Sequence, residues 1–201
     1  LTLGGGSASD SSIVFDGNAQ DFHIGLDDSA DSLTIGLGST LGTTSHMVFD
    51  ANGHITKPLQ SAFNVNKSAH QTNIPINADT TITFDTERFD QNGDFASNTF
   101  TAPVTGKYQL NLNAAVLQTD SAAGYIIFYI NTSNKKYLTY IDPTSFSSDV
   151  DYLTFNLVIL TDMDANDTST ISFLQNNGSA QADVTGGSGD VGTSFSGYLV
   201  C

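Results

Sequence analysis

Between residues 98 and 116 the sequence NTFTAPVTGKYQLNLNAAV passes from a proline turn into strict alternation of apolar and polar residues. Successive side chains of a β-strand point to opposite faces, so this stretch has one dry face and one polar face. The dry face would carry Tyr108, Leu110, Leu112, Ala114 and Val116, and the polar face Lys107, Gln109, Asn111 and Asn113. The pattern predicts a half-buried strand over residues 107–117.

From about Pro58 onward, apolar runs recur between turn-forming clusters, and no segment combines helical periodicity with caps. We expect strands over residues 61–66, 72–76, 80–85, 99–102, 107–117, 124–131, 136–141, 151–161, 168–175 and 193–200. About ten strands in a segment of this size are typical of an all-β jelly-roll sandwich of two sheets.

Two of the predicted strands are apolar on both faces. They are GYIIFYIN at 124–131 and DYLTFNLVIL at 151–160, where Val158 and Leu160 oppose Leu157 and Ile159. A strand in an isolated two-sheet sandwich should be dry on one face only. We therefore expect another copy of the chain to cover the outer faces in a symmetric interface, with a covering loop as the alternative.

Residues 1–56 follow another pattern, in which short alternating stretches are separated by turn clusters. This region contains seven Asp and nine Gly but no Lys or Arg, and IVFDGNAQ and MVFDANGH suggest a weak internal repeat. A single chain of this composition buries too little apolar surface to offset its ordering entropy. We interpret residues 1–57 as a β stalk intertwined from three copies, followed by a globular head over 58–201. A loose, glycine-rich linker is the alternative to the stalk.

The charge balance narrows the range of partners. The net charge is −15, because 21 acidic residues face only 6 Lys and Arg. Nucleic acids and anionic membranes attract clustered basic residues, so we expect neither as a partner. No apolar run reaches the ~18 residues of a membrane span. The single cysteine, Cys201, allows no intrachain disulfide, and the start LTLGGG, without Met, is typical of a fragment or a processed form.

One loop has the residue spacing of a calcium site. In DMDAND, Asp162, Asp164 and Asn166 take alternate positions, like the first ligands of a helix-loop-helix calcium loop. That loop type also requires a glycine and a bidentate glutamate where this chain has Asp167 and Phe173. Bound calcium and a solvated acidic hairpin loop are the two alternatives, and no other cofactor is indicated.

Five motifs occur in an order that resembles a known head domain. They are AFNVN at 62–66, FDTERFDQNGDF at 84–95, FTAPVTGKYQL at 100–110, YIIFYIN at 125–131 and FSGYLV at 195–200. Together they are similar to the globular head of complement component one, subcomponent q, and its relatives in the tumour necrosis factor superfamily, over about residues 60–201. The chain departs from that pattern because it has no Gly-X-Y stalk and carries TDMDANDTST instead of a short Gly-Asp turn.

The resemblance implies a ten-stranded jelly roll that assembles as a tight homotrimer. It also implies structural roles for Phe100, Pro103, Gly106 and Tyr108 in the turn into a central strand, and for Phe195 and Gly197 in the closing strand. Gly106 is expected to adopt a backbone conformation that a Cβ would hinder. The acidic segment 84–95 is expected to be a loop.

The stretch SIVFDGNAQDFHIGLDDSADSLTIGLGS resembles segments of tail-fibre and appendage proteins of bacterial viruses. With the head, it predicts a homotrimeric knob on an extracellular virion fibre that binds a host-surface receptor such as a polysaccharide. Tyr137 and Tyr140 would stack on sugars or pack at the subunit interface. We expect no catalysis, because Glu87 is the only glutamate. The alternatives are a purely structural capsid or tail decoration protein and a secreted lectin-like head of a cellular organism.

Overall fold

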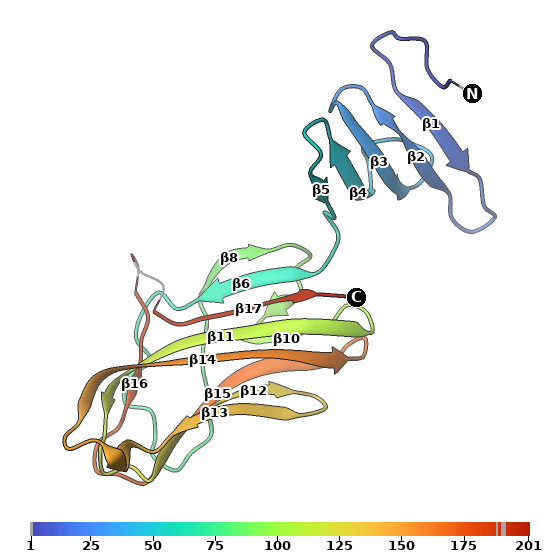
Figure 1. The fold of residues 1–201 in the computed structure, drawn as a ribbon. Coiled ribbons are helices and arrows are strands. Elements are labelled where there is room, and N and C mark those ends of the chain that lie inside the picture. Colours follow the sequence, from blue (N-terminus) through green and yellow to red (C-terminus); the bar gives the residue numbers. More distant parts are fainter. Residues whose placement is uncertain (1, 188, 190–191) are drawn as a thin grey trace. The chain divides into compact units, whose positions relative to one another are not determined.

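A computed structural model describes residues 2–187, 189 and 192–201 of the chain (Figure 1). The chain divides into two compact units, Leu1–Gln60 and Ser61–Cys201, which we call the N-terminal unit and the head. The division falls close to Pro58, where the hydrophobic pattern changes. Among the described residues the only helical element is a short 3-10 turn, Pro143–Ser145, and strands form the remaining elements.

The N-terminal unit is one antiparallel sheet of five strands that neighbour one another in chain order (Figure 1). The strands are β1 (Ser11–Phe15), β2 (Phe22–Asp27), β3 (Ser32–Leu37), β4 (Ser45–Asp50) and β5 (Ile55–Thr56). Four of them lie where the short alternating stretches predict strands. In the register, Ile13 is opposite Ile24 and Ile24 is opposite Ile35, so the apolar positions of successive strands share one face.

The other face of this sheet carries small and polar residues, and the loop between β3 and β4 folds back toward it. His23 Nδ1 lies 2.9 Å from the carbonyl oxygen of Gly38, and the Gly38 N–H donates to the Asp21 carbonyl oxygen at 2.8 Å. As a result His23 and Thr34 are buried, with 1% and 2% of their surface exposed. The chain thus covers the middle of this face, around His23 and Thr34, whereas Val14 on the edge strand stays 38% exposed.

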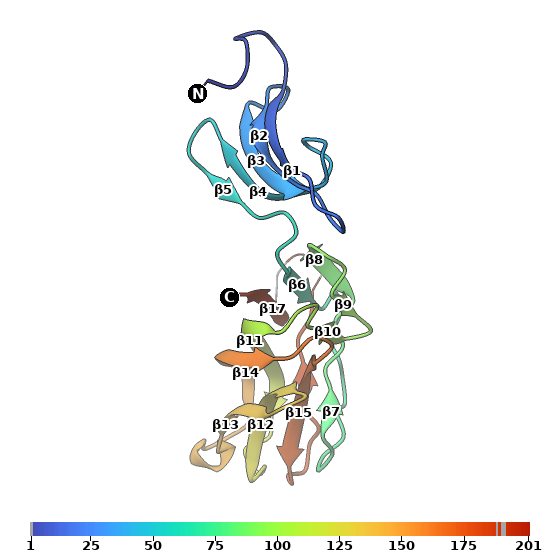
Figure 2. The ribbon, with the colours of Figure 1, turned by 90° about the vertical axis from the view of Figure 1, so that its right-hand side faces the viewer.

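The head consists of two six-stranded antiparallel sheets. The first sheet, in spatial order, contains β13 (Lys136–Ile141), β12 (Tyr125–Thr132), β15 (Thr168–Asn176), β10 (Thr99–Thr101) and β9 (Phe95–Ala96), with β7 (Thr80–Thr81) beside β15. The second contains β14 (Val150–Met163), β11 (Gly106–Thr119), β17 (Ser194–Leu199), β6 (Ala62–Asn66) and β8 (Thr86–Asp90), with β16 (Asp183–Val184) beside β11. In Figure 2, strands β13, β12, β15 and β7 follow one another across one layer. The predicted two-sheet architecture is confirmed.

The core of the head lies between the inner faces of these two sheets. Tyr108, Leu110, Ala114 and Val116 of β11 have no exposed surface, as the alternation of this segment predicts. At one end of the core the Phe63 ring stacks on Phe100 with a centroid distance of 4.6 Å and meets Phe195 edge-on at 5.0 Å. Such buried aromatic pairs contribute both apolar area and orientation-dependent attraction.

Residues 61–100 depart most from the predicted strands. Residues 72–76 form no strand, because Asn73 and Asn77 adopt left-handed backbone conformations with φ of 53° and 59°. Of residues 80–85, only Thr80 and Thr81 form a strand. The segment 84–95, expected as a loop, instead contributes β8 and part of β9. The segment around Ile74 is held instead by long-range bonds such as Ile74 N–H to the Ala182 carbonyl oxygen (3.1 Å), and the acidic segment forms β8 because it pairs with β6.

A buried lysine organises the same irregular segment. Lys67 is 3% exposed, and its ammonium donates to the Thr83 carbonyl oxygen at 2.7 Å, the Thr83 hydroxyl at 3.0 Å and Gln71 Oε1 at 3.3 Å. Burial lowers the pKa of Lys67, while the nearby Asp85 carboxylate partly opposes that shift. The three oxygens explain how an ammonium group is accommodated inside the head.

The residues expected to shape the turn into β11 differ in their roles. Phe100 is fully buried, and its ring meets the Tyr108 ring edge-on at 5.5 Å. The Tyr108 hydroxyl donates to the Val104 carbonyl oxygen at 2.7 Å, which closes the turn, whereas Pro103 is exposed. Burial raises the pKa of Tyr108, and this hydrogen bond only partly offsets the effect.

Gly106 and Gly197 are required for close approach of neighbouring groups. A Cβ on Gly106 would lie 2.7 Å from the Cys201 carbonyl oxygen, and a Cβ on Gly197 would lie 2.6 Å from Leu110 Cδ2 and 2.9 Å from the Phe63 ring. Gly106 is not among the residues with positive φ, so the expectation of a special backbone conformation was wrong. The space around the residue, rather than its φ, excludes a side chain there.

Asp120, at the end of β11, anchors the loop that follows β15. Its carboxylate is 1% exposed and accepts the backbone N–H groups of Ala122 (2.8 Å), Ala180 (2.8 Å) and Ser179. Burial alone would raise the pKa of Asp120, but the backbone hydrogen bonds outweigh it, so the pKa lies below its ordinary value. The carboxylate therefore stabilises the fold above its unfolded-state pKa, and this contribution is lost as pH falls through the lower, folded-state pKa.

We expect Asp120→Asn to reduce the free energy of unfolding by about 2–3 kcal/mol at neutral pH, because an amide cannot accept all of these bonds and one of its ends repels N–H donors. Urea unfolding at pH 7 and at pH 3 measures the effect, and the difference between wild type and variant should shrink at the lower pH. Asp164→Asn, an exposed loop aspartate, is the control and should change the stability little. Equal stabilities of wild type and Asp120→Asn at pH 7 would contradict the anchoring role.

Candidate binding and assembly surfaces

The polar side chains of β11 form a hydrogen-bonded ladder on the outer face of their sheet. The Tyr198 hydroxyl donates to Gln109 Oε1 at 3.1 Å, and Gln109 Nε2 donates to Asn111 Oδ1 at 3.1 Å. Asn111 Nδ2 in turn donates to the Ser196 hydroxyl at 3.4 Å. The polar face of this strand is therefore already ordered in a single chain, which reduces the entropy lost if another surface packs on it.

Beside this ladder runs an apolar row on β14, the edge strand of the sheet. Tyr152, Val158 and Leu160 point outward, with exposed fractions of 76%, 63% and 63%. Val158 and Leu160 are neighbours on this face, and the polar residues Thr154 and Asn156 separate them from Tyr152. Val158 lies opposite Asn111 and Leu160 lies opposite Gln109. The strand is thus apolar on both faces, as its sequence predicts, and its outer side is uncovered in one chain. A long edge strand with exposed apolar residues promotes association unless another surface covers it.

The outer face of the other sheet carries a second exposed surface, which is partly aromatic. Tyr140 and Leu138 of β13 are 68% and 47% exposed. On the neighbouring β12, Ile127 is opposite Tyr140 and Tyr129 is opposite Leu138, so these four side chains share one face. We call Ile127, Tyr129, Leu138 and Tyr140 the tyrosine face.

An ion pair borders the tyrosine face. The Lys136 ammonium lies 2.9 Å from the Asp79 carboxylate and 5.1 Å from the centre of the Tyr129 ring. Partial burial raises the pKa of Asp79, but hydrogen bonds from Ser172 and Lys136 outweigh it, so the pKa is lowered overall. The tyrosine face therefore carries an exposed ring, that of Tyr140, and, near Tyr129, groups that donate and accept hydrogen bonds, so it suits both stacking and polar recognition.

Tyr137 and Tyr140 do not form a shared stacking platform, because they point to opposite faces of β13. Tyr137 pairs with the buried Ile130 and packs against the core, and its hydroxyl donates to the Thr161 hydroxyl at 2.9 Å. Their separation of three positions already places them on different faces of a strand. Only Tyr140 presents its ring to solvent.

The acidic loop between β14 and β15 forms a compact turn. Asp167 accepts the backbone N–H of Asp164 and an N–H of Asn134, both at 2.9 Å, and Asp164 accepts the Thr105 hydroxyl at 3.4 Å. Asn166 has a left-handed φ of 74°, and Asp162 is exposed on β14. Among the described residues no three His, Cys, Asp or Glu side chains converge as metal ligands. Calcium at Asp162, Asp164 and Asn166 therefore stays a prediction.

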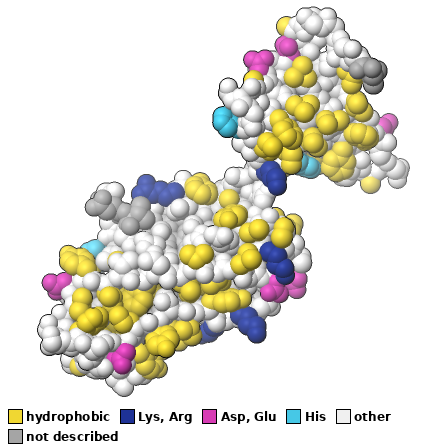
Figure 3. Space-filling view, viewed as in Figure 1, with side chains coloured by type: hydrophobic (Ala, Val, Ile, Leu, Met, Phe, Trp, Pro, Cys, Tyr) yellow, Lys and Arg dark blue, Asp and Glu magenta, His cyan; other side chains and the backbone are white. Residues whose placement is uncertain are grey.

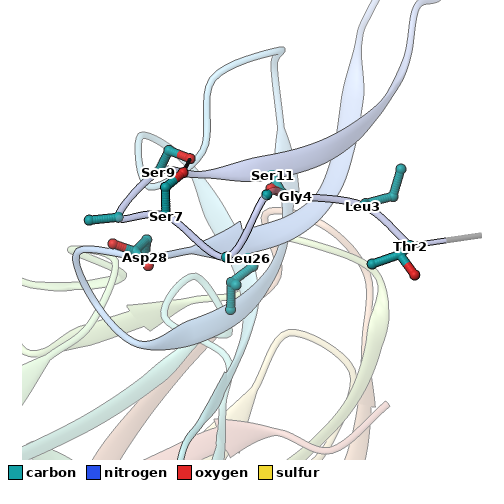
Figure 4. Close-up of a pocket in the computed structure, with 11 residues that line it drawn as sticks. Thr2, Leu3, Gly4, Ser7, Ser9, Ser11, Leu26 and Asp28 are labelled. Carbon is teal, nitrogen blue, oxygen red and sulfur yellow. Dashed lines mark hydrogen bonds between the residues drawn. The ribbon is translucent and has the colours of Figure 1, made fainter.

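A shallow hollow lies where residues 2–9 pass the hairpin of β1 and β2 (Figure 4). Its lining consists mainly of small and hydroxyl side chains, with Leu26 from β2 and Asp28 from the turn that follows it. The hydroxyls of Ser7 and Ser9 lie 3.2 Å apart and bond to each other. These groups form no arrangement to which we assign a ligand.

No helix in the described part of the chain has the length and apolarity of a membrane span.

Neither known family profiles nor curated protein sequences match this chain. Solved structures do match it. The globular domain of zebrafish complement 1qA protein is 17% identical, with a TM-score of 0.50, and the match covers 71% of this chain and 98% of that one. The fold of the head is therefore that of the complement 1q globular domain. Murine APRIL is 9% identical with a TM-score of 0.49, and that match covers 70% of this chain and 99% of the other.

The match confirms the complement-type jelly roll that the five ordered motifs predict. Sequence reasoning had singled out Val158 and Leu160 but had missed most of the tyrosine face. The alternation of Lys136, Leu138 and Tyr140 was a signal for it, because residues at this spacing share one side of a strand. The Lys136–Asp79 pair had no such signal, since its two residues are far apart in sequence.

Proposed function

We propose that the chain is the distal part of a homotrimeric virion fibre whose head binds a host-surface receptor, without catalysis. The observation that carries this proposal is the outward apolar row of Tyr152, Val158 and Leu160 on an edge strand. In a threefold ring each chain's row is covered by a surface of the next copy, so that all three rows are covered once the ring closes. The complement-type fold of the head and the resemblance of the N-terminal stretch to viral appendages support the rest.

Solution mass tests the assembly. Light scattering of the intact chain should give about three times the 21.2 kDa of one chain. A mass of one chain at micromolar concentration would contradict the trimer. The acidic chain has few basic groups, so the association should rest on apolar burial and persist at high salt.

The receptor would bind at the tyrosine face, on the outer side of β12 and β13. Of the two strands that are apolar on both faces, only β14 would then be covered by another copy, and not β12 as expected from the sequence. The Tyr140 ring offers an apolar platform for the C–H side of a sugar, and Lys136 and Asp79, at the Tyr129 end of the tyrosine face, offer polar groups. Three such sites on one head, repeated over several fibres, raise apparent affinity by on the order of 10²–10⁴-fold. Surface polysaccharides, which repeat the same unit, suit this arrangement.

The histidine chemistry of the head supports a role in binding rather than catalysis. His70 is its only histidine, and Nδ1 of that ring accepts the Gly186 backbone N–H at 3.0 Å. That nitrogen is thereby occupied by a structural bond and cannot at the same time take a proton from a nucleophile.

Tyr140→Ala should weaken binding of the head to polysaccharide by about tenfold per site, which corresponds to a stacking contribution of about 1.4 kcal/mol. Titrating the fluorescently labelled chain over a panel of immobilised bacterial surface polysaccharides measures this loss of affinity. Phe89→Ala removes an exposed ring on β8 of the other sheet and should leave binding unchanged. If no polysaccharide shows saturable binding at micromolar protein, a decoration role replaces attachment.

A further inference from the structure

The sheet of the N-terminal unit has one face that is almost entirely apolar. Pairing in register brings together Ile13 and Phe15 of β1, Phe22, Ile24 and Leu26 of β2, Leu33, Ile35 and Leu37 of β3, Met47 and Phe49 of β4, and Ile55 of β5. We call these eleven residues the stalk face. None of them is ionisable, and Figure 3 shows hydrophobic side chains gathered over this unit.

The stalk face is not buried by its own chain. All buried apolar side chains among the described residues lie in the head, and none lies within residues 2–60. The three buried side chains of the N-terminal unit are polar ones on the opposite face: His23, Ser32 and Thr34. A five-stranded sheet without an apolar core cannot offset the entropy lost on ordering its chain.

The exposed area approaches that of a stable subunit interface. Phe15 is 59% exposed, Ile55 57%, Leu26 47%, Phe22 43%, Ile13 42% and Leu33 41%. A full aromatic side chain has an area of roughly 150–250 Å², and an aliphatic side chain has less. Since about half of each of these six side chains is exposed, together they expose on the order of 500 Å² of apolar surface. The five partly covered members add to this. Monomers rarely expose larger apolar patches, and a standard interface buries about 800 Å² per partner.

The chemistry of the face selects a like surface as its partner. Without charges, the stalk face offers no group to recognise a polar ligand, and residues 1–56 contain no Lys or Arg to pair with an acidic one. Each unit is also covalently joined to a head. If three heads associate, as proposed above, the three stalk faces are held near one another at an effective concentration of about millimolar, which favours a copy over any free partner.

We propose that the stalk faces of three copies close on one another around a threefold axis and form a shared apolar core that no single copy possesses. The side chains of β2 and β3 at the middle of the sheet would lie nearest the axis, and the polar face with its covering loop would point to solvent. This inference rests on the proposed trimer, and its test must therefore separate the two.

Single-cysteine labelling of the full chain provides the test. In a Cys201→Ser background, Ile13→Cys places a thiol on the stalk face and Val14→Cys places one on the opposite face of the same strand. The two native side chains are 42% and 38% exposed in one chain, so the thiols should react equally fast unless another copy covers one. We expect a maleimide dye to label Ile13→Cys at least about tenfold more slowly than Val14→Cys. Leu33→Cys, on β3, should be protected as well.

Light scattering on each variant separates failure of this inference from failure of the proposed function. A trimeric mass with slow labelling at positions 13 and 33 supports the shared core. A trimeric mass with equal rates at 13 and 14 overturns the shared core and leaves the head trimer standing. A monomeric mass overturns the threefold core whatever the labelling rates, and a dimeric mass with protected thiols replaces it with a two-sheet sandwich. Far-UV circular dichroism confirms that each variant is folded.

Discussion

Leu160→Lys is expected to convert the trimer into monomers at concentrations where the wild-type chain is fully assembled. Leu160 is 63% exposed on the β14 edge, in line with Val158 and beside the ordered Gln109 side chain. Burial of one such leucine side chain contributes about 1.5–3 kcal/mol, and a lysine ammonium in the same place would have to lose its hydration. Asp162, two positions along the same face of β14, lies opposite Lys107 in the register, so a second lysine there adds positive charge beside an existing one. Because the substitution occurs once in every copy, its effect is counted three times in one trimer.

Sedimentation velocity or light scattering over a concentration series measures the change. We expect the midpoint of dissociation to rise at least about 100-fold, which for a trimer corresponds to about 10⁴-fold in the dissociation constant, or about 5.5 kcal/mol. Leu138→Lys is the matched control, because it places the same charge on an exposed leucine of the other edge strand, β13. Trimers of Leu160→Lys that survive dilution as well as wild type would show that β14 is not the interface. Loss of the trimer in Leu138→Lys alone would move the interface to the tyrosine face.

Phe63→Ala is expected to lower the free energy of unfolding of the head by about 3–5 kcal/mol, the largest loss for a single core residue that we predict. The Phe63 ring is 1% exposed and lies within 5.3 Å of the Phe95, Phe100 and Phe195 ring centres. Its removal leaves a cavity whose walls are other rings and the backbone of the closing strand, which cannot collapse into the space.

Denaturant unfolding followed by tyrosine fluorescence measures this loss. Wild type and variants must be compared at one chain concentration, because assembly adds to the apparent stability. Phe89→Ala removes the same side chain at a 51% exposed position on β8 and should cost less than about 1 kcal/mol. Equal losses for the two variants would contradict a packed aromatic core around Phe63.

Prediction from the sequence succeeded where neighbouring residues alone decide the structure. The alternation in β11 identified the buried row from Tyr108 to Val116, and both sides of β14 were recognised as apolar. A period-two pattern depends only on the geometry of one strand, so it can be recognised without knowing which strands pair with it. The ordered motifs from AFNVN to FSGYLV likewise led to the correct jelly roll.

Candidate site residues were harder to place, since their roles depend on which element packs on each face. Tyr137 and Tyr140 look alike in sequence, yet one ring meets the core and the other faces solvent. The acidic stretch 84–95 reads as a loop, but pairing with β6 turns part of it into β8. Lys67 and Asp120 gave no local signal for the segments they hold, because Thr83 and Ala180 lie many residues away from them.

The sequence by itself determined that this is an all-β chain of two units, with a dry-faced central strand, apolar stripes and almost no basic groups. Those properties follow from residue type and spacing. Only the tertiary structure decided which apolar faces remain open, which glycines make room for a neighbour, and which carboxylate holds a distant loop. These features depend on contacts between segments far apart in the chain, so they cannot be predicted from any local sequence pattern.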